Sequence, residues 1–385
     1  MTDRLPNASL AFLMAGIAVV GIASLMLSPM LTDVMADLRV GPERIGLAVG
    51  AYGAGVALSA FLSAPRLDRW PRRTALQIAF VVFAAGLFLA AAAFDWRVLL
   101  AGQFIAGAAC GVIIPGSYAA ASDISPAAMR TQALGRVVLG WSIALVMGVP
   151  LASVLSDTVG WRGAFLLVAV LSSAQAFVLR FLPPSPRTSA QPTAPYAAAL
   201  AVPGMKPLLC GTLAFMFAFY GAYAFFGDHL RTVHAAGAWL VGIAAMSYGL
   251  GYGLTALADS FIDKADPRRV LPPAMAFVCL EYLVLPFMTQ WVAVAIGFAF
   301  VWGVINHFAM TSLVSSISRA PAGARGTALG LFSTVTYVAH GLSGPVMGWL
   351  YARHGFHAVS WTASAGAGLM AVVLALTVLP LARRG

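Results

Sequence analysis

The segment PAAMRTQALG, residues 126–135, recurs later in the chain as PAGARGTALG, residues 321–330. The two segments are separated by 195 residues, and other landmarks repeat at the same offset without a gap. These further pairs are Asp33 with Asp228, Asp68 with Asp263, Pro150 with Pro345, and Gly160 with Gly355. Self-similarity in one register indicates a duplicated structural unit. The chain is therefore predicted to consist of two copies of the same fold.

The composition points to a membrane. Hydrophobic residues make up 61% of the 385 residues, and charged residues only 9%, whereas soluble domains carry about 25% charge. So few charges cannot solvate the surface, and we expect a lipid bilayer around the protein. The net charge of +10 comes from basic residues in short loops between apolar runs. We interpret these basic residues as a signal for the orientation of the helices in the membrane, and we predict no nucleic-acid partner.

A membrane-spanning helix needs roughly 20 apolar residues, and twelve such runs are present. They cover approximately residues 9–35, 44–65, 74–94, 98–121, 132–156, 162–182, 207–230, 238–260, 270–289, 291–315, 327–351 and 358–381. Only residues 183–206, which are rich in Pro, Ser and Thr, are long enough for a linker. The prediction is an all-α integral membrane protein with an N-terminal six-helix bundle (1–182), a cytoplasmic linker (183–206) and a C-terminal six-helix bundle (207–385).

The basic residues predict the orientation. With the N-terminus inside, seventeen Lys and Arg residues fall on the cytoplasmic side and six on the other. Such an excess marks the cytoplasmic loops. We therefore expect a multi-pass protein of the inner (plasma) membrane with both termini in the cytoplasm.

The loop after the second predicted span reads APRLDRWPRR, residues 64–73. It resembles the G-x-x-x-D-R-x-G-R-R loop of the major facilitator superfamily, although Ala64 and Pro71 replace glycines. A carboxylate among guanidiniums can tie helix ends together in one conformation and release them in another; plain positive-inside anchoring is the alternative. The predicted gating residues here and at the corresponding sites are Asp68, Arg69, Arg72, Arg73, Arg130, Asp263 and Arg325.

The fifth predicted span, GWSIALVMGVPLASVL, residues 140–155, resembles part of the antiporter motif of the same superfamily. Small residues and a proline let two helices approach closely and bend; helix packing alone would explain them equally well. We assign Gly148, Pro150, Gly344 and Pro345 to conformational gating. The resemblance implies alternating access by the drug/proton antiporter branch. One departure is Gln103, which stands where many proton antiporters have a buried Arg, and this puts the usual proton-relay scheme in doubt.

Ionisable residues within predicted spans are candidates for proton coupling, because they are costly in hydrocarbon. Glu281 lies in the ninth span, about eleven residues from its start, and could bind and release a proton. The alternative is a permanently protonated, hydrogen-bonded residue on a peripheral helix. Asp33 and Asp228 lie at the predicted outer ends of matching helices, where they could take up protons, gate the mouth or simply be solvated. His307 and His340 complete this set.

Aromatic and amide side chains fall mostly on helices that the resemblance predicts to face a central cavity. The predicted substrate-binding residues are Tyr52, Gln103, Tyr118, Trp141, Tyr220, Tyr223, Tyr248, Trp302, Asn306 and Tyr337. Such a wall suits a small amphipathic or weakly charged molecule, although aromatics are also common at lipid interfaces.

No motif for catalysis, a metal ion or a cofactor is found in the sequence. The predicted function is therefore proton-coupled efflux by a monomeric secondary transporter and not an enzymatic activity. The alternative is an uptake symporter or uniporter for a small polar metabolite.

Overall fold

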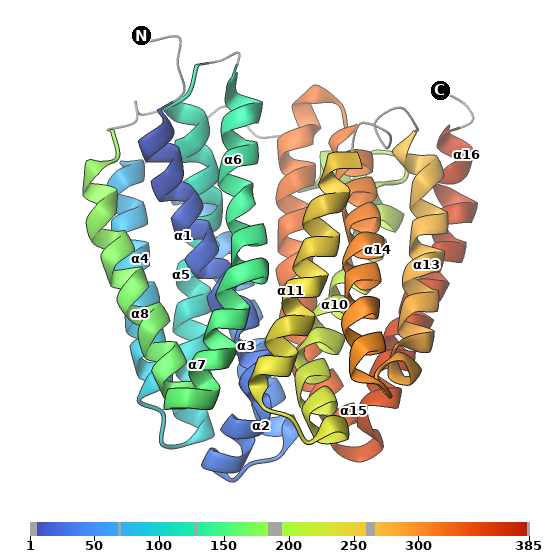
Figure 1. The fold of residues 1–385 in the computed structure, drawn as a ribbon. Helices are drawn as coiled ribbons and strands as arrows, with labels where there is room; N and C mark the ends of the chain where they lie inside the picture. The colour runs from blue at the N-terminus through green and yellow to red at the C-terminus, as the bar shows by residue number, and fades with distance from the viewer. Residues whose placement is uncertain (1–5, 68–70, 127–128, 184–194, 259–265, 383–385) are drawn as a thin grey trace.

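The computed structural model describes residues 6–67, 71–126, 129–183, 195–258 and 266–382. These residues form helices and no strands. The long helices run side by side along one direction, and the two ends of the chain lie at the same end of the bundle (Figure 1). We call this end the terminal end and the opposite one the distal end.

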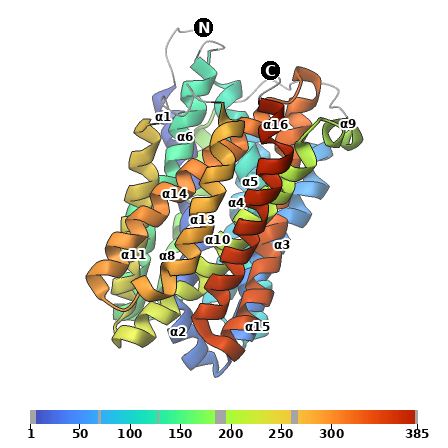
Figure 2. The ribbon, with the colours of Figure 1, turned by 90° about the vertical axis from the view of Figure 1, so that its right-hand side faces the viewer.

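The helices divide at the linker into two sets. The first set is α1 (Asn7–Leu25), α2 (Leu27–Leu38), α3 (Pro42–Leu67), α4 (Arg72–Ala91), α5 (Trp96–Asp123), α6 (Arg130–Ile143), α7 (Val149–Val159) and α8 (Trp161–Val178). The second set is α9 (Tyr196–Leu200), α10 (Met205–His234), α11 (Ala238–Thr255), α13 (Pro267–Met288), α14 (Val292–Ser318), α15 (Ala322–Thr377) and α16 (Leu379–Ala382). The two sets lie on opposite sides of the molecule in Figure 1, and the short α9 packs on α15 near the terminal end (Figure 2).

Twelve crossings are present among the described residues. Ten helices are long and apolar enough to span a membrane, and the last of them covers residues 323–377. That helix is two arms joined at Gly355, whose φ of 70° favours glycine. The helix α11 runs beside the others at the same depth (Figure 1). The predicted all-α, twelve-helix fold is confirmed.

Prolines account for local breaks in the helices. The residues Ala144–Gly148 form a π-helical turn between α6 and α7, and this turn ends two residues before Pro150. Since proline has no N–H and its ring displaces the preceding turn, the regular hydrogen-bond ladder is interrupted here. The side chain of Ile22 on α1 occupies the space that a Cβ on Gly148 would need. The fifth predicted span is therefore one bent crossing made of α6 and α7.

The two sets of helices meet through glycine and proline in a nearly symmetric way. The helix α3 packs on α15, and α7 packs on α11. A Cβ built on Gly50 of α3 would lie 2.5 Å from Cδ of Pro345, and one built on Gly242 of α11 would lie 3.0 Å from Cα of Pro150. Each proline thus faces a glycine of the opposite set, and the missing side chain allows the helix backbones to approach closely.

Candidate functional site

Aromatic side chains from both sets of helices meet about halfway along the bundle. The ring of Tyr220 (α10) stacks on His340 (α15), with centroids 3.8 Å apart and planes 2° apart. The ring of Tyr52 (α3) lies 5.8 Å from the same imidazole, and its hydroxyl is 3.0 Å from Sγ of Cys110 on α5. The imidazole of His340 is therefore enclosed by tyrosines from opposite sets.

Three further aromatic residues extend this contact. The indole Nε1 of Trp141 donates to the hydroxyl of Tyr118 at 3.1 Å, and both side chains are half-buried. Tyr337 is half-buried and lies three residues before His340 on α15, so the two side chains share one face of that helix. We define the central cluster as Tyr52, Tyr118, Trp141, Tyr220, Tyr337 and His340. All six are predicted site residues, and the fold brings them together.

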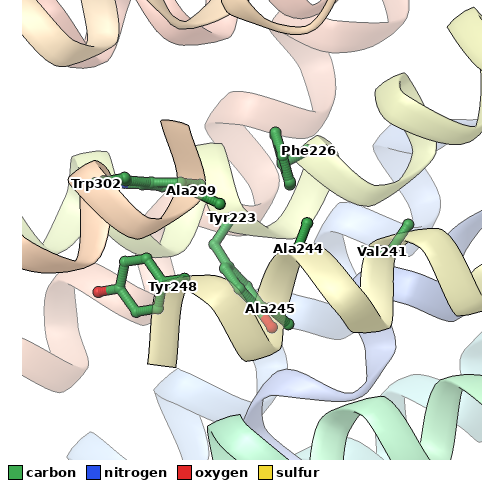
Figure 3. Close-up of a pocket in the computed structure, with 8 residues that line it drawn as sticks. All are labelled: Tyr223, Phe226, Val241, Ala244, Ala245, Tyr248, Ala299 and Trp302. Carbon is green, nitrogen blue, oxygen red and sulfur yellow. The ribbon is translucent and has the colours of Figure 1, made fainter. Parts of the chain in front are cut away.

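A separate small pocket lies within the second set, between α10, α11 and α14 (Figure 3). Its volume is about 10 Å³, which is room for roughly one water molecule. Its lining residues are Tyr223, Phe226, Val241, Ala244, Ala245, Tyr248, Ala299 and Trp302. The walls are largely aromatic and apolar, and three of the predicted substrate-binding residues (Tyr223, Tyr248 and Trp302) belong to them.

Glu281 lies behind this pocket and points into the bundle, with 2% of its side chain exposed. The amide oxygen of Asn306 accepts from the hydroxyl of Tyr248 at 3.2 Å and from Trp302 Nε1 at 3.0 Å, and Trp302 Nε1 also lies 3.2 Å from the hydroxyl of Tyr282. In the same orientation, Asn306 Nδ2 donates to Glu281 Oε1 at 2.9 Å. We call Tyr248, Glu281, Tyr282, Trp302 and Asn306 the buried network.

The distal end carries an ion pair between the two sets. Arg231 of α10 donates through Nη1 and Nη2 to the two carboxylate oxygens of Asp33 on α2, each at 2.8 Å. Arg231 Nη1 also donates to the carbonyl of Pro29 at 3.0 Å. The hydroxyl of Ser156 on α7 donates to the same carboxylate at 3.3 Å. This bidentate geometry is the strong form of a charged hydrogen bond.

Asp228, which corresponds to Asp33 in the repeat, makes a second contact between the two sets of helices at this end. The residue is 6% exposed, and its carboxylate accepts from Thr32 of α2 at 2.7 Å and from Tyr351 of α15 at 2.6 Å. Nearby, Asp157 of α7 accepts from the backbone amides of residues 238 and 239 at the start of α11, both at 2.8 Å. The distal lock is defined as Thr32, Asp33, Asp157, Asp228, Arg231 and Tyr351.

The remaining predicted polar residues lie apart from these groups. His307 is buried, with its Nε2 3.3 Å from the hydroxyl of Thr311 and its ring 4.9 Å from that of Tyr252. Gln103 is buried on α5, and its Oε1 has no hydrogen-bond partner among the described residues. The structure thus places neither side chain in the central cluster or in the buried network.

The structure describes only some of the predicted gating residues at the terminal end. Asp68, Arg69 and Asp263 lie outside the described residues. Arg72 forms an ion pair with Asp123 of α5 at 3.5 Å, and Arg73 donates to the carbonyl of Arg180 at 3.2 Å. The side chains of Arg130 and Arg325 are exposed. Gly344 lies close to α3, where an added Cβ would be 2.6 Å from the backbone nitrogen of Gly50.

Sequence reasoning missed several residues that the structure brings into these groups. Arg231, counted only as a topology signal, holds Asp33, and Thr32, Tyr351 and Asp157 complete the distal lock. The polar run FFGDHLR, residues 225–231, marks the location, but the pairing joins residues 198 positions apart. Only the tertiary structure can show such a contact. Among the described residues, no group of three or more His, Cys, Asp or Glu side chains is arranged to hold a metal ion.

Comparison with known proteins identifies the family. The profile of the Major Facilitator Superfamily matches residues 13–344. The MFS-type transporter YwfA of Bacillus subtilis is 26% identical over 89% of this chain and 85% of its own length. A chloramphenicol resistance protein of Streptomyces lividans is 25% identical over 88% of this chain and 87% of its own length.

A third relative and a solved structure agree with this assignment. A protein of Mannheimia succiniciproducens named "Probable sugar efflux transporter" is 25% identical over 76% of this chain and 74% of its own length. The structure of a bacterial homologue of the human lysosomal transporter Spinster, inward-facing and occupied, superposes with a TM-score of 0.79. It is 16% identical and covers 99% of both chains, which supports the fold. The protein is a multi-pass membrane transporter of small molecules, and it belongs to the major facilitator superfamily.

Proposed function

We propose that this transporter exports a small amphipathic or weakly charged organic molecule in exchange for protons. The observation that carries this proposal is the central cluster, in which both sets of helices contribute aromatic rings around one buried imidazole. An aromatic surface binds flat apolar groups, and hydroxyl and imidazole groups orient a few polar atoms. The cluster contains no Lys or Arg, so a strongly anionic substrate would find no counter-charge there.

The proposed mechanism is rocking of residues 1–182 against residues 207–385, with residues 183–206 as the connection. The distal lock and the two proline–glycine contacts join the sets at one end, and opening that end requires these contacts to separate. Transporters with two parallel repeats expose a midplane site alternately to each side. The terminal end is assigned to the cytoplasm of the inner membrane, because it receives most of the basic residues. Since one chain supplies both sides of the central cluster, the working unit is a monomer.

Chloramphenicol is the first substrate to test, because one relative is named a chloramphenicol resistance protein, and a disaccharide is the second, because another relative is named for sugar efflux. The full chain is reconstituted in liposomes that contain a pH-sensitive dye, and a pH gradient of either sign is imposed. Export by antiport predicts proton movement opposite to the substrate. Co-movement of substrate and proton would favour the symporter, and transport unaffected by pH would favour a uniporter.

A further inference from the structure

His340 occupies a contact between the two sets of helices that the first copy of the repeat builds with leucine. A Cβ added to Gly53 of α3 would lie 2.7 Å from the backbone carbonyl carbon and 2.8 Å from Cβ of His340. At the related contact, a Cβ added to Gly249 of α11 would lie 2.8 Å from Cβ of Leu145. Residue 145 corresponds to residue 340 at the offset of 195. Leucine satisfies the packing at such a contact, so packing alone does not account for an imidazole.

The ring nitrogens of His340 have no hydrogen-bond partner among the described residues, although the residue is only 2% exposed. The contacts of the ring are aromatic ones, with Tyr220 at 3.8 Å and Tyr52 at 5.8 Å, while Ser343 Oγ donates to the backbone carbonyl. The two nitrogens are not sealed off by the protein, in contrast to Nδ1 of His307. Buried polar groups are normally hydrogen-bonded, because leaving them unpaired costs free energy. This imidazole therefore has hydrogen-bonding capacity that the protein itself does not use.

The surroundings of His340 contain no counter-charge. The charged residues of α3, α10 and the first arm of α15 lie toward the helix ends, and Glu281, on α13, is held by Asn306. The titratable groups whose rings face the imidazole are Tyr220 of α10 and Tyr52 of α3. A buried imidazolium without a counter-charge is unfavourable. The neutral ring offers one N–H donor and one acceptor nitrogen.

Further hydroxyl groups of the central cluster are also available. The hydroxyls of Tyr220 and Tyr337 make no hydrogen bond to the described part of the chain. The hydroxyl of Tyr118 accepts from Trp141 Nε1 at 3.1 Å and retains its own O–H as a donor. Donors and acceptors thus lie among aromatic rings. This combination suits a flat ring that carries a group able both to donate and to accept, such as a hydroxyl or an amide.

We propose that His340 is the specificity-determining residue of the central cluster, and that the substrate is a neutral molecule whose flat ring carries a hydroxyl or amide group. This inference rests on the proposed function and names the substrate class for its site. The imidazole forms hydrogen bonds with the polar group, and the tyrosine rings pack on the flat ring. A charged substrate would lose its hydration here without gaining a counter-charge. Because His340 also packs against Gly53 of the opposite set, the substrate binds where the two sets meet.

Binding of matched probes to the full chain in lipid nanodiscs tests this assignment without transport. The probes are 4-nitrobenzyl alcohol, its methyl ether and 4-nitrobenzoate, which share a flat ring and differ in the attached group. Saturable quenching of tryptophan fluorescence, corrected with empty nanodiscs, measures each affinity. We expect the alcohol to bind roughly two- to tenfold more tightly than the ether, the equivalent of one hydrogen bond, and the benzoate to bind most weakly. Equal affinities for alcohol and ether, or no saturable binding of the alcohol, overturn the inference.

Three variants assign the preference for the alcohol to the imidazole. His340→Leu introduces the residue that the first copy uses at this contact, and it should abolish the difference between alcohol and ether. His340→Gln, which keeps a donor and an acceptor, should retain the difference. The control is His354→Leu, the same substitution at an exposed position of α15, and it should behave like the wild type. A preference for the alcohol that persists in His340→Leu overturns the role of His340.

The transport assay described above separates this inference from the proposed function. A higher KM for chloramphenicol in His340→Leu, with proton coupling retained, supports the inference. Loss of proton coupling with an unchanged KM would make His340 a proton carrier; this overturns the inference and leaves the exporter intact. A wild-type protein that prefers the alcohol in the binding assay but moves no protons with its substrate overturns proton-coupled export and leaves recognition by His340 intact.

Discussion

Arg231 uses all of its guanidinium nitrogens at the distal end. Nη1 and Nη2 hold Asp33, and Nε donates to the carbonyl of Ala236 at 3.3 Å. The guanidinium side chain is only 10% exposed, and that of Asp33 is 33% exposed. A charge-assisted pair in partly buried surroundings depends strongly on its partner, because the remaining charge is left without compensation when one side is removed. The pair therefore joins the two sets of helices more firmly than an exposed ion pair would.

Loss of this ion pair should open the distal end. Asp33→Asn and Arg231→Gln each remove charged hydrogen bonds worth about 1.5–3 kcal/mol, which corresponds to a population shift of roughly tenfold or more. Double electron–electron resonance between spin labels on the distal ends of α2 and α10 should show a new, longer distance. Arg353→Gln is the matched control, since Arg353 lies at the same end and stacks on Trp349 within its own set. An unchanged distance distribution in both variants would contradict the lock.

The stacked pair of Tyr220 and His340 should govern substrate affinity. Tyr220→Ala removes the ring, and an aromatic contact contributes about 0.5–1.5 kcal/mol beyond the buried area. We expect the KM for transport to rise about tenfold, whereas Tyr220→Phe should change it far less. Phe177→Ala on α8 serves as the control, because that ring is exposed on the outside of the bundle. Equal KM values for the wild type and Tyr220→Ala would remove the central cluster from substrate binding.

At the scale of whole helices, the contact between the sets depends on how closely the backbones approach. The helices α3 and α15 meet along Gly46, Gly50 and Gly53, and each of these positions would bring a Cβ against the backbone or a side chain of α15. Without a hydrophobic driving force in lipid, association of helices relies on packing and on such small residues. The distal closure is therefore sensitive to single methyl groups.

A methyl group at Gly50 should hinder closure. Gly50→Ala places a Cβ 2.5 Å from Pro345, so α3 and α15 must separate, and we expect the transport rate to fall severalfold or more. Gly297→Ala on α14 is the matched control, because nothing lies within 4 Å of its added Cβ. In a helix, alanine is favoured over glycine by about 1 kcal/mol, so the control should be neutral or stabilising. Full transport in Gly50→Ala would contradict the tight contact.

For the whole molecule, transport by rocking requires the distal ends of the two sets to separate and rejoin in every cycle. The hydroxyl of Thr32 and the carboxylate of Asp228 lie 2.7 Å apart across this contact. The backbone of Tyr223 also accepts from the hydroxyl of Ser28, and these two residues are 195 positions apart, the offset of the repeat. The contact thus lies close to the axis that relates the two copies.

A reversible cross-link across this contact should stop turnover. With Thr32→Cys and Asp228→Cys combined, oxidation should abolish transport in proteoliposomes, and a reducing agent should restore it. The control pair, Asp37→Cys with Trp161→Cys, replaces a hydrogen bond of 3.2 Å within the first set and should leave transport active after oxidation. Continued transport by the oxidised Thr32–Asp228 pair would rule out separation of the sets at this end.

The sequence by itself determined the membrane location and the twelve helices of the fold. An apolar run long enough to cross a bilayer is a local property of the chain, and a repeat at a constant offset is found by comparing the sequence with itself. All six members of the central cluster were also candidates from the sequence, because aromatic residues and a histidine on the helices of a known fold can be assigned to a face.

Only the tertiary structure decided which polar groups are partners. Arg231 could not be assigned to Asp33 from the sequence, because contacts nearly 200 residues apart follow from how two bundles pack rather than from a local pattern. Glu281 could be recognised as buried, but its approach to Asn306 depends on the rotation of α13 against α14. A helix in lipid can be apolar on every side, so its sequence does not fix which face packs inward. The rotation is set by packing against neighbouring helices, and the buried network exists only after that packing has formed.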